Sequence, residues 1–190
     1  MSAFEHVTAL LSFVYALALT HLLARIAELI VARERVRFSG LLALAMVNAV
    51  LIVFVNWLSL WDLRSVTKWD LASIAIQFLF AVSVYVICAL VGPKMPDDGT
   101  IDLEDFFWRQ RTYFYGAIIV CLVLALLANL DFLKTPNTAL FVKENVGTLT
   151  LLVPAALGLL SRNRLVQWAA GVCFLALIVG FAIVFSSTLA

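Results

Sequence analysis

Charged residues are scarce in this sequence, and their scarcity excludes most soluble folds. Only 13% of the 190 residues are Asp, Glu, Lys or Arg, and 64% are hydrophobic. A typical soluble domain has about 25% charged residues. The net charge of +1 also excludes the strongly basic face that nucleic-acid binding requires. We therefore expect the chain to be surrounded by the lipid bilayer and to bind no nucleic acid.

Metal-ligating and nucleophilic motifs are also missing. The three cysteines (Cys88, Cys121 and Cys173) lie in separate apolar stretches without CxxC spacing, so we expect buried free thiols. His6 and His21 are roughly 22 Å apart along a helix, too far to share one haem or metal ion within one chain. The sequence has no HExxH, no Gly-rich phosphate loop and no GxSxG. It therefore predicts no catalytic residue and no haem, zinc or nucleotide site.

Six long apolar stretches account for most of the chain. A helix of about 20 apolar residues crosses a hydrocarbon core roughly 30 Å thick. The last five stretches contain no Asp, Glu, Lys or Arg. The sequence predicts an all-α polytopic membrane protein in which residues 1–190 form a single bundle of six transmembrane helices, over Val7–Ala24, Leu41–Trp61, Leu71–Gly92, Thr112–Leu130, Asn145–Ser161 and Leu165–Ala190.

The loop charges predict the orientation, because Lys and Arg concentrate in short cytoplasmic loops. With both termini outside, nine basic residues face the cytoplasm: Arg25, Arg33, Arg35, Arg37, Lys94, Arg109, Arg111, Arg162 and Arg164. Only four face the opposite side: Arg64, Lys68, Lys134 and Lys143. We expect a multi-pass protein of the bacterial inner membrane with both termini in the periplasm. All five tryptophans lie near the ends of the predicted spans, where their rings suit the headgroup region: Trp57, Trp61, Trp69, Trp108 and Trp168.

The segment 93–111 is the longest predicted cytoplasmic connection. Pro93 and Pro96 end the preceding helix, and an acidic cluster follows. Asp102 and Asp105 fit an N-cap and a favourable carboxylate in the first turn of the next helix. We expect an acidic loop followed by a helix that enters through the interface, and this loop is the segment that a partner subunit would read.

One polar stripe interrupts the first apolar stretch. His21, Arg25 and Glu28 follow i, i+4, i+7 spacing, which places them on one helix face. The stripe is either a proton- or anion-handling site, with His21 titrating and Arg25 holding an anion, or a structural feature. In the structural alternative Arg25 pairs with Glu28 and His21 bonds a neighbouring helix.

Uncharged amides supply the other polar groups at membrane depth. Asn56 and Gln77 have similar predicted depths and could form an interhelical pair, and Asn48 is at a depth that could meet His21. With Arg25 and Glu28, these residues form the predicted ligand or ion site. Such amides more often stabilise packing than line a permeation path.

Three segments together resemble a known group of sequences. They are Phe4–Leu23 (in particular Phe4-Glu5-His6-Val7 and Ser12–Leu23), Trp57–Asp62, and Phe107-Trp-Arg-Gln-Arg111. They resemble an uncharacterised family of small six-span bacterial membrane proteins, over roughly the first two-thirds of the chain. The resemblance implies the six-span fold and brings no activity with it.

Two function classes remain. The first is a non-catalytic binding or accessory component of the membrane, acting as a homo-oligomer or with a partner subunit. The second is a small transporter or channel with its path near His21 and Arg25. An enzyme acting on lipids or quinones is the least favoured class. The sparse polar content of the spans favours the binding or accessory role.

Overall fold

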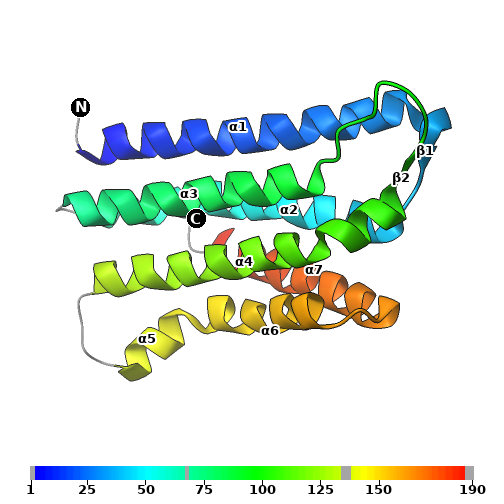
Figure 1. Ribbon diagram of the computed structural model, residues 1–190. Helices are drawn as coiled ribbons and strands as arrows, with labels where there is room; N and C mark the ends of the chain where they lie inside the picture. The colour runs from blue at the N-terminus through cyan, green and yellow to red at the C-terminus, as the bar shows by residue number, and fades with distance from the viewer. Residues whose placement is uncertain (1–2, 67–68, 134–137, 187–190) are drawn as a thin grey trace.

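The computed structural model describes residues 3–66, 69–133 and 138–186 and is helical throughout most of them (Figure 1). Lys68, Lys134 and residues 187–190, which entered the predictions above, lie outside the described residues. The α-helices are α1 (Ala3–Val31), α2 (Gly40–Ser59), α3 (Leu71–Val91), α4 (Leu103–Leu133), α5 (Thr138–Glu144), α6 (Val146–Leu160) and α7 (Arg164–Ser186). Short 3-10 helices follow α1 and α2, η1 (Arg33–Arg35) and η2 (Leu60–Ser65).

Five of these helices (α1, α2, α3, α4 and α7) are long and apolar enough to cross a membrane. The predicted fifth span differs. It corresponds to the short helix α6, and α5, which precedes the predicted span, meets α6 at an angle of 67°. The 15 residues of α6 rise about 22 Å, which is less than a hydrocarbon core of roughly 30 Å. The all-helical class is confirmed, and the number of possible spans is five, or six if the bent pair counts as one.

Two helices are longer than their apolar stretches predict. Helix α1 continues to Val31, beyond the predicted end at Ala24, and α4 begins at Leu103 rather than at Thr112. Apolar patterning marks only the part of a helix that lipid or protein surrounds. A helix continues into water as long as its backbone bonds form, and long charged side chains at its ends reach away from the apolar zone.

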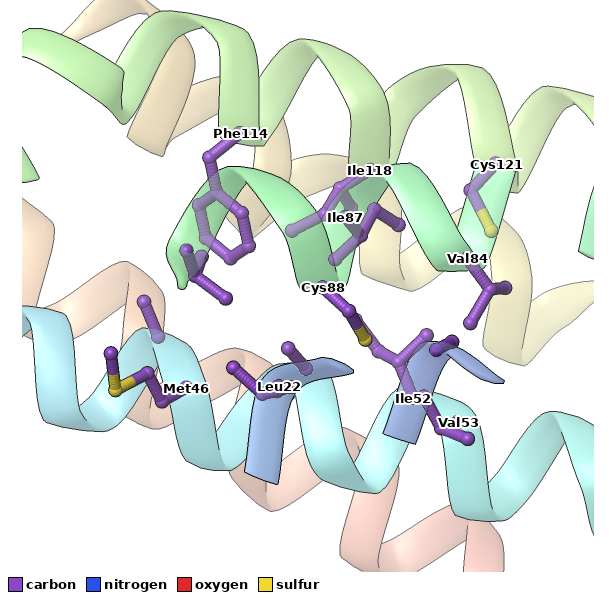
Figure 2. Packing of buried hydrophobic residues seen from close by; sticks show 14 of the residues in the cluster. Leu22, Met46, Ile52, Val53, Val84, Ile87, Cys88, Phe114, Ile118 and Cys121 are labelled. Atoms are coloured by element: carbon purple, nitrogen blue, oxygen red, sulfur yellow. The ribbon is translucent and has the colours of Figure 1, made fainter. Parts of the chain in front are cut away.

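The helices lie side by side with alternating direction (Figure 1). Helix α4 packs between α3 and α6, α2 contacts both α3 and α7, and α1 packs on α3 and α2. Figure 2 shows the core between them, where Ile52 of α2, Ile87 of α3 and Ile118 of α4 project into the space between helices. Capping residues mark the start of two helices: Ser39 and Asp70 cap α2 and α3 by accepting from N–H groups of the first turn.

The predicted cytoplasmic connections are joined to each other at one end of the helices. Strand β1 (Val36–Arg37) follows η1, and strand β2 (Ile101–Asp102) precedes α4. They pair in parallel, with Val36 opposite Ile101 and Arg37 opposite Asp102. This contact ties the turn after α1 to the loop after α3.

Candidate functional site

Two of the three residues in the polar stripe of α1, Arg25 and Glu28, form the ion pair of the structural alternative. Arg25 Nη1 lies 2.8 Å from Glu28 Oε2, so the predicted ion pair is confirmed. The stem of Arg25 packs against the end of α3: a Cβ added to Gly92 would lie 3.0 Å from Arg25 Cγ. The His21 ring centroid is 5.8 Å from that of Tyr85 in α3. The proton- or anion-handling role of this stripe stays a prediction.

Asn48 joins α2 to α7. Its side chain is buried, and Nδ2 donates to the Gly171 carbonyl at 3.0 Å. The two helices approach closely here, because a Cβ on Gly171 would lie only 2.6 Å from Leu44 Cδ2. An amide bonding across a small residue is typical of helix packing in membranes. Asn48 therefore bonds α7, and the predicted contact with His21 is not among the described hydrogen bonds.

Asn56 and Gln77 do not form the predicted pair. Asn56 Nδ2 donates to the Ile52 carbonyl of its own helix at 2.7 Å. Helix geometry explains the difference, because a carbonyl four residues back is always within reach of a short polar side chain. The two amides nevertheless share one site, since both line the same cavity.

This cavity, of about 550 Å³, is the main candidate site. Ligand pockets commonly have volumes of roughly 300–1,000 Å³. The cavity opens among the end of α2, η2, the start of α3, the end of α4 and the start of α6, toward the end of the molecule where α1 begins. On α3 its wall extends from Gln77 to Ile87, ten residues or about 15 Å along a helix. The cavity therefore reaches roughly halfway through a membrane-sized core.

Polarity changes along the depth of the cavity. The inner wall is largely apolar and includes Ile87, Ile118, Cys121, Phe174 and Ile178. Apart from Tyr15 in the middle of α1, the polar lining gathers toward the helix ends at the mouth: Asn56, Ser59, Asp62, Gln77, Asn129, Glu144 and Thr148. An apolar interior with polar groups at one end is suited to a ligand that has an apolar body and a polar head.

The half of the core beyond this cavity is densely packed. A gap of about 10 Å³ lies there, among Phe107, Phe114, Tyr115 and their neighbours, which is space for about one water molecule. The Tyr115 ring lies directly on the backbone of α6, since a Cβ on Gly158 would come within 2.3 Å of it. In this conformation the packed aromatic rings end the cavity near mid-depth.

A buried cation holds the far end of α6. Arg111 is only 5% exposed, and Nη1 donates to the carbonyls of Gly158 at 2.8 Å, of Leu159 at 3.0 Å and of Ser161. Gln167 Nε2 donates to two of the same carbonyls, those of Gly158 and Ser161. The last carbonyls of a helix have no partner within it and carry a partial negative charge. Arg111 and Gln167 therefore form a C-terminal cap.

The break between α5 and α6 has a polar anchor that sequence reasoning missed. Asn145 is fully buried at the break, and its Nδ2 donates to the Phe141 carbonyl at 2.9 Å. Its Oδ1 accepts from Asn129 Nδ2 of α4. The bond fixes the bent pair against the wall of the cavity. The only indication of this anchor in the sequence is that Asn129 and Asn145 lie at the ends of apolar stretches.

The acidic loop is bonded within the chain. Asp102 Oδ1 accepts from the backbone N–H groups of Glu104 (2.9 Å) and Asp105 (3.1 Å), which confirms the predicted N-cap. These bonds, that from Asp105 foremost, hold the pKa of the Asp102 carboxyl below its usual value, and Arg37 at 2.7 Å adds to the effect. Asp105 pairs with Arg109 at 2.9 Å. Two carboxylates of the loop expected to meet a partner, Asp102 and Asp105, are thus engaged by neighbouring residues.

No protein-family model, curated protein or solved structure matches this chain significantly. The class of protein that the fold defines is a helical bundle with several membrane-length apolar helices. The resemblance of the segments near Phe4, Trp57 and Phe107 to a small bacterial membrane family stays a prediction.

Proposed function

We propose that this chain is a non-catalytic binding component of the bacterial inner membrane that holds an amphiphilic molecule in its cavity. In this proposal the bent pair α5–α6 counts as one span, the fifth in chain order, which brings the total to six, and both termini face the periplasm. The basic residues gathered at the β1–β2 end favour that end as the cytoplasmic one. The cavity then opens toward the periplasmic half of the bilayer.

The cavity is the observation that carries the proposal. It is large enough for a ligand, its lining changes from largely polar at the mouth to apolar inside, and it ends at packed aromatic rings. A cavity that reaches only half the membrane thickness supports a binding function better than it supports a channel, which needs a continuous path. The described lining residues include no histidine, the side chain that most often serves as a general acid or base.

A direct binding assay tests the proposal. The protein is reconstituted in phosphatidylcholine nanodiscs, and binding of tritiated dodecan-1-ol is followed by scintillation proximity, with empty nanodiscs as background. We expect saturable binding to the wild type and weaker binding to Ala125→Phe, because Ala125 lines the cavity and a phenyl ring there takes up part of its volume. The matched control Ala169→Phe places the same ring on an exposed position of α7 and should bind normally. Non-saturable binding, or full binding by Ala125→Phe, would refute the proposal.

A transporter is the second candidate, favoured by the broken pair α5–α6 beside the cavity. Interrupted helices with a polar break often line transporter sites, and α6 also contains Pro154. In this alternative the cavity is one state of an alternating-access cycle. Exchange of labelled ligand across proteoliposomes distinguishes the two: a bound but non-exchanging ligand supports the binding role, and saturable exchange supports transport.

A further inference from the structure

We propose that a buried gap between α2, α4 and α7 is a binding site for one water molecule, held by the side-chain oxygens of Asn48 and Gln167. The gap is the one of about 10 Å³ that lies beyond the inner end of the cavity. This water site does not depend on what occupies the larger cavity. It follows from which polar atoms of the two amides remain unpartnered, and from the size and charge of the gap.

Asn48 and Gln167 each keep a side-chain acceptor for another molecule. A backbone carbonyl can only accept, so the bond to the Gly171 carbonyl identifies the amide nitrogen of Asn48. In the same way, the bonds to the carbonyls of Gly158 and Ser161 identify the amide nitrogen of Gln167. The remaining atoms are Asn48 Oδ1 and Gln167 Oε1. Both are buried without a hydrogen-bond partner among the described residues.

Both amides line the same small gap. Asn48 is 4% exposed and Gln167 is 1% exposed, and apart from Leu44 the other lining residues are buried as well. An unpartnered buried acceptor is costly, and buried water molecules commonly satisfy such groups. Because the gap holds about one water molecule, a single occupant touches both side chains. The two oxygens therefore share one occupant, which donates protons to them.

The surroundings of the gap favour a neutral occupant over a cation. The described lining residues of the gap include neither Asp nor Glu. A positive charge already lies close by, because Arg111 Nη1 and Gln167 Nε2 donate to the same Gly158 carbonyl, each at 2.8 Å. A second cation would be repelled by this guanidinium and would have no counter-charge in the lining. Water has the right size and two protons, one for each oxygen.

The bound water links α2 to α7 at the inner end of the cavity. Ile118 and Phe174 line both the gap and the cavity, so these two side chains lie between them. The direct bond from Asn48 to the Gly171 carbonyl joins the same two helices, and the water adds a second connection, from Asn48 to Gln167. Water-mediated hydrogen bonds are nearly as favourable in enthalpy as direct ones. The water therefore helps to hold α2 against α7 where the cavity ends.

Nuclear magnetic resonance of the protein in detergent micelles tests for this water. The protein is deuterated, its Asn and Gln side chains are isotope-labelled, and magnetisation transfer from water protons to each side-chain amide is recorded. We expect nuclear Overhauser effects of opposite sign in the laboratory and rotating frames at Asn48 and Gln167. Opposite signs are the signature of a long-lived water, and they exclude transfer by chemical exchange of the amide protons.

Variants assign the signal to the gap. Gln167→Met removes one acceptor at similar side-chain length, so the effect at Asn48 should be lost, whereas Gln110→Met, the same change at a half-buried position of α4, should retain it. Because Gln167→Met also removes part of the cap on α6, Ala45→Val is a second test. Ala45 lines the gap, and the added methyl groups take up space in it while both amides remain. Both effects should be lost, and Ala43→Val, outside the lining, should change neither.

The outcomes distinguish a water from a cation and from a dry gap. Absence of the effects at Asn48 and Gln167 in the wild type would overturn the water site. So would an effect at Asn48 that persists in both Gln167→Met and Ala45→Val. Melting temperatures in sodium, potassium and choline chloride at equal ionic strength should be the same. A rise with sodium or potassium that Gln167→Met removes would assign the gap to a cation and overturn the proposal.

Discussion

Replacing Arg111 with alanine tests whether a buried cation holds α6 in place. The change removes three hydrogen bonds from a charged donor to the carbonyls at the end of α6. Gln167 continues to serve two of those carbonyls, so the Leu159 carbonyl is the one that loses its only described donor.

The expected magnitude follows from these contacts. A hydrogen bond from a charged donor contributes about 1.5–3 kcal/mol, and a cation at a helix C-terminus about 0.3–2 kcal/mol. Removing a buried cation also relieves its desolvation, which offsets part of the loss. We therefore expect Arg111→Ala to lower the free energy of unfolding by about 2–4 kcal/mol.

The assay is equilibrium unfolding in mixed micelles titrated with dodecyl sulfate and followed by tryptophan fluorescence. Arg109→Ala is the matched control, because Arg109 and its partner Asp105 are 71% and 62% exposed and such a pair contributes less than about 1 kcal/mol. Combining Arg111→Ala with Gln167→Ala should cost more than the sum of the single changes, since the two side chains share acceptors. An Arg111→Ala variant as stable as Arg109→Ala would refute the capping role.

Two further predictions concern packing and pH. Gly158→Ala should destabilise the protein by about 1–3 kcal/mol in the same unfolding assay, because the added methyl group meets the Tyr115 ring. Gly116→Ala, with nothing within 4 Å of its added Cβ, should be neutral or slightly stabilising; equal effects of the two would contradict the close contact. The ionised Asp102 carboxylate stabilises the folded state above its unfolded pKa of about 3.9, and this stabilisation is lost as pH falls through the lower folded pKa. Melting temperatures from pH 6 to 3 should therefore fall more for the wild type than for Asp102→Asn, and parallel curves would show that the cap from Asp105 does not depend on the charge.

Part of the candidate site could be predicted from the sequence, because two of its polar residues lie deep within predicted membrane spans. Asn56 and Gln77 were singled out because amides at membrane depth need partners, and both line the cavity. The predicted pair is not among the described hydrogen bonds, because Asn56 donates instead to the Ile52 carbonyl in its own helix. His21, chosen because it titrates, lies against Tyr85 of α3, and His21 is not among the residues that line the cavity.

The amino-acid sequence was enough to predict the helical class, because long uncharged apolar runs leave the backbone no partners except its own. It also determined local features such as the Asp102 cap, which depend on residues a few positions apart. The tertiary structure was needed to show that the fifth apolar stretch is a short helix bent by 67° against α5, that Arg111 is buried under the end of α6, and that the helices leave a cavity between them. Those features depend on which helix faces meet, and apolar residues surround so much of each helix that their pattern does not distinguish a face toward lipid from a face toward protein.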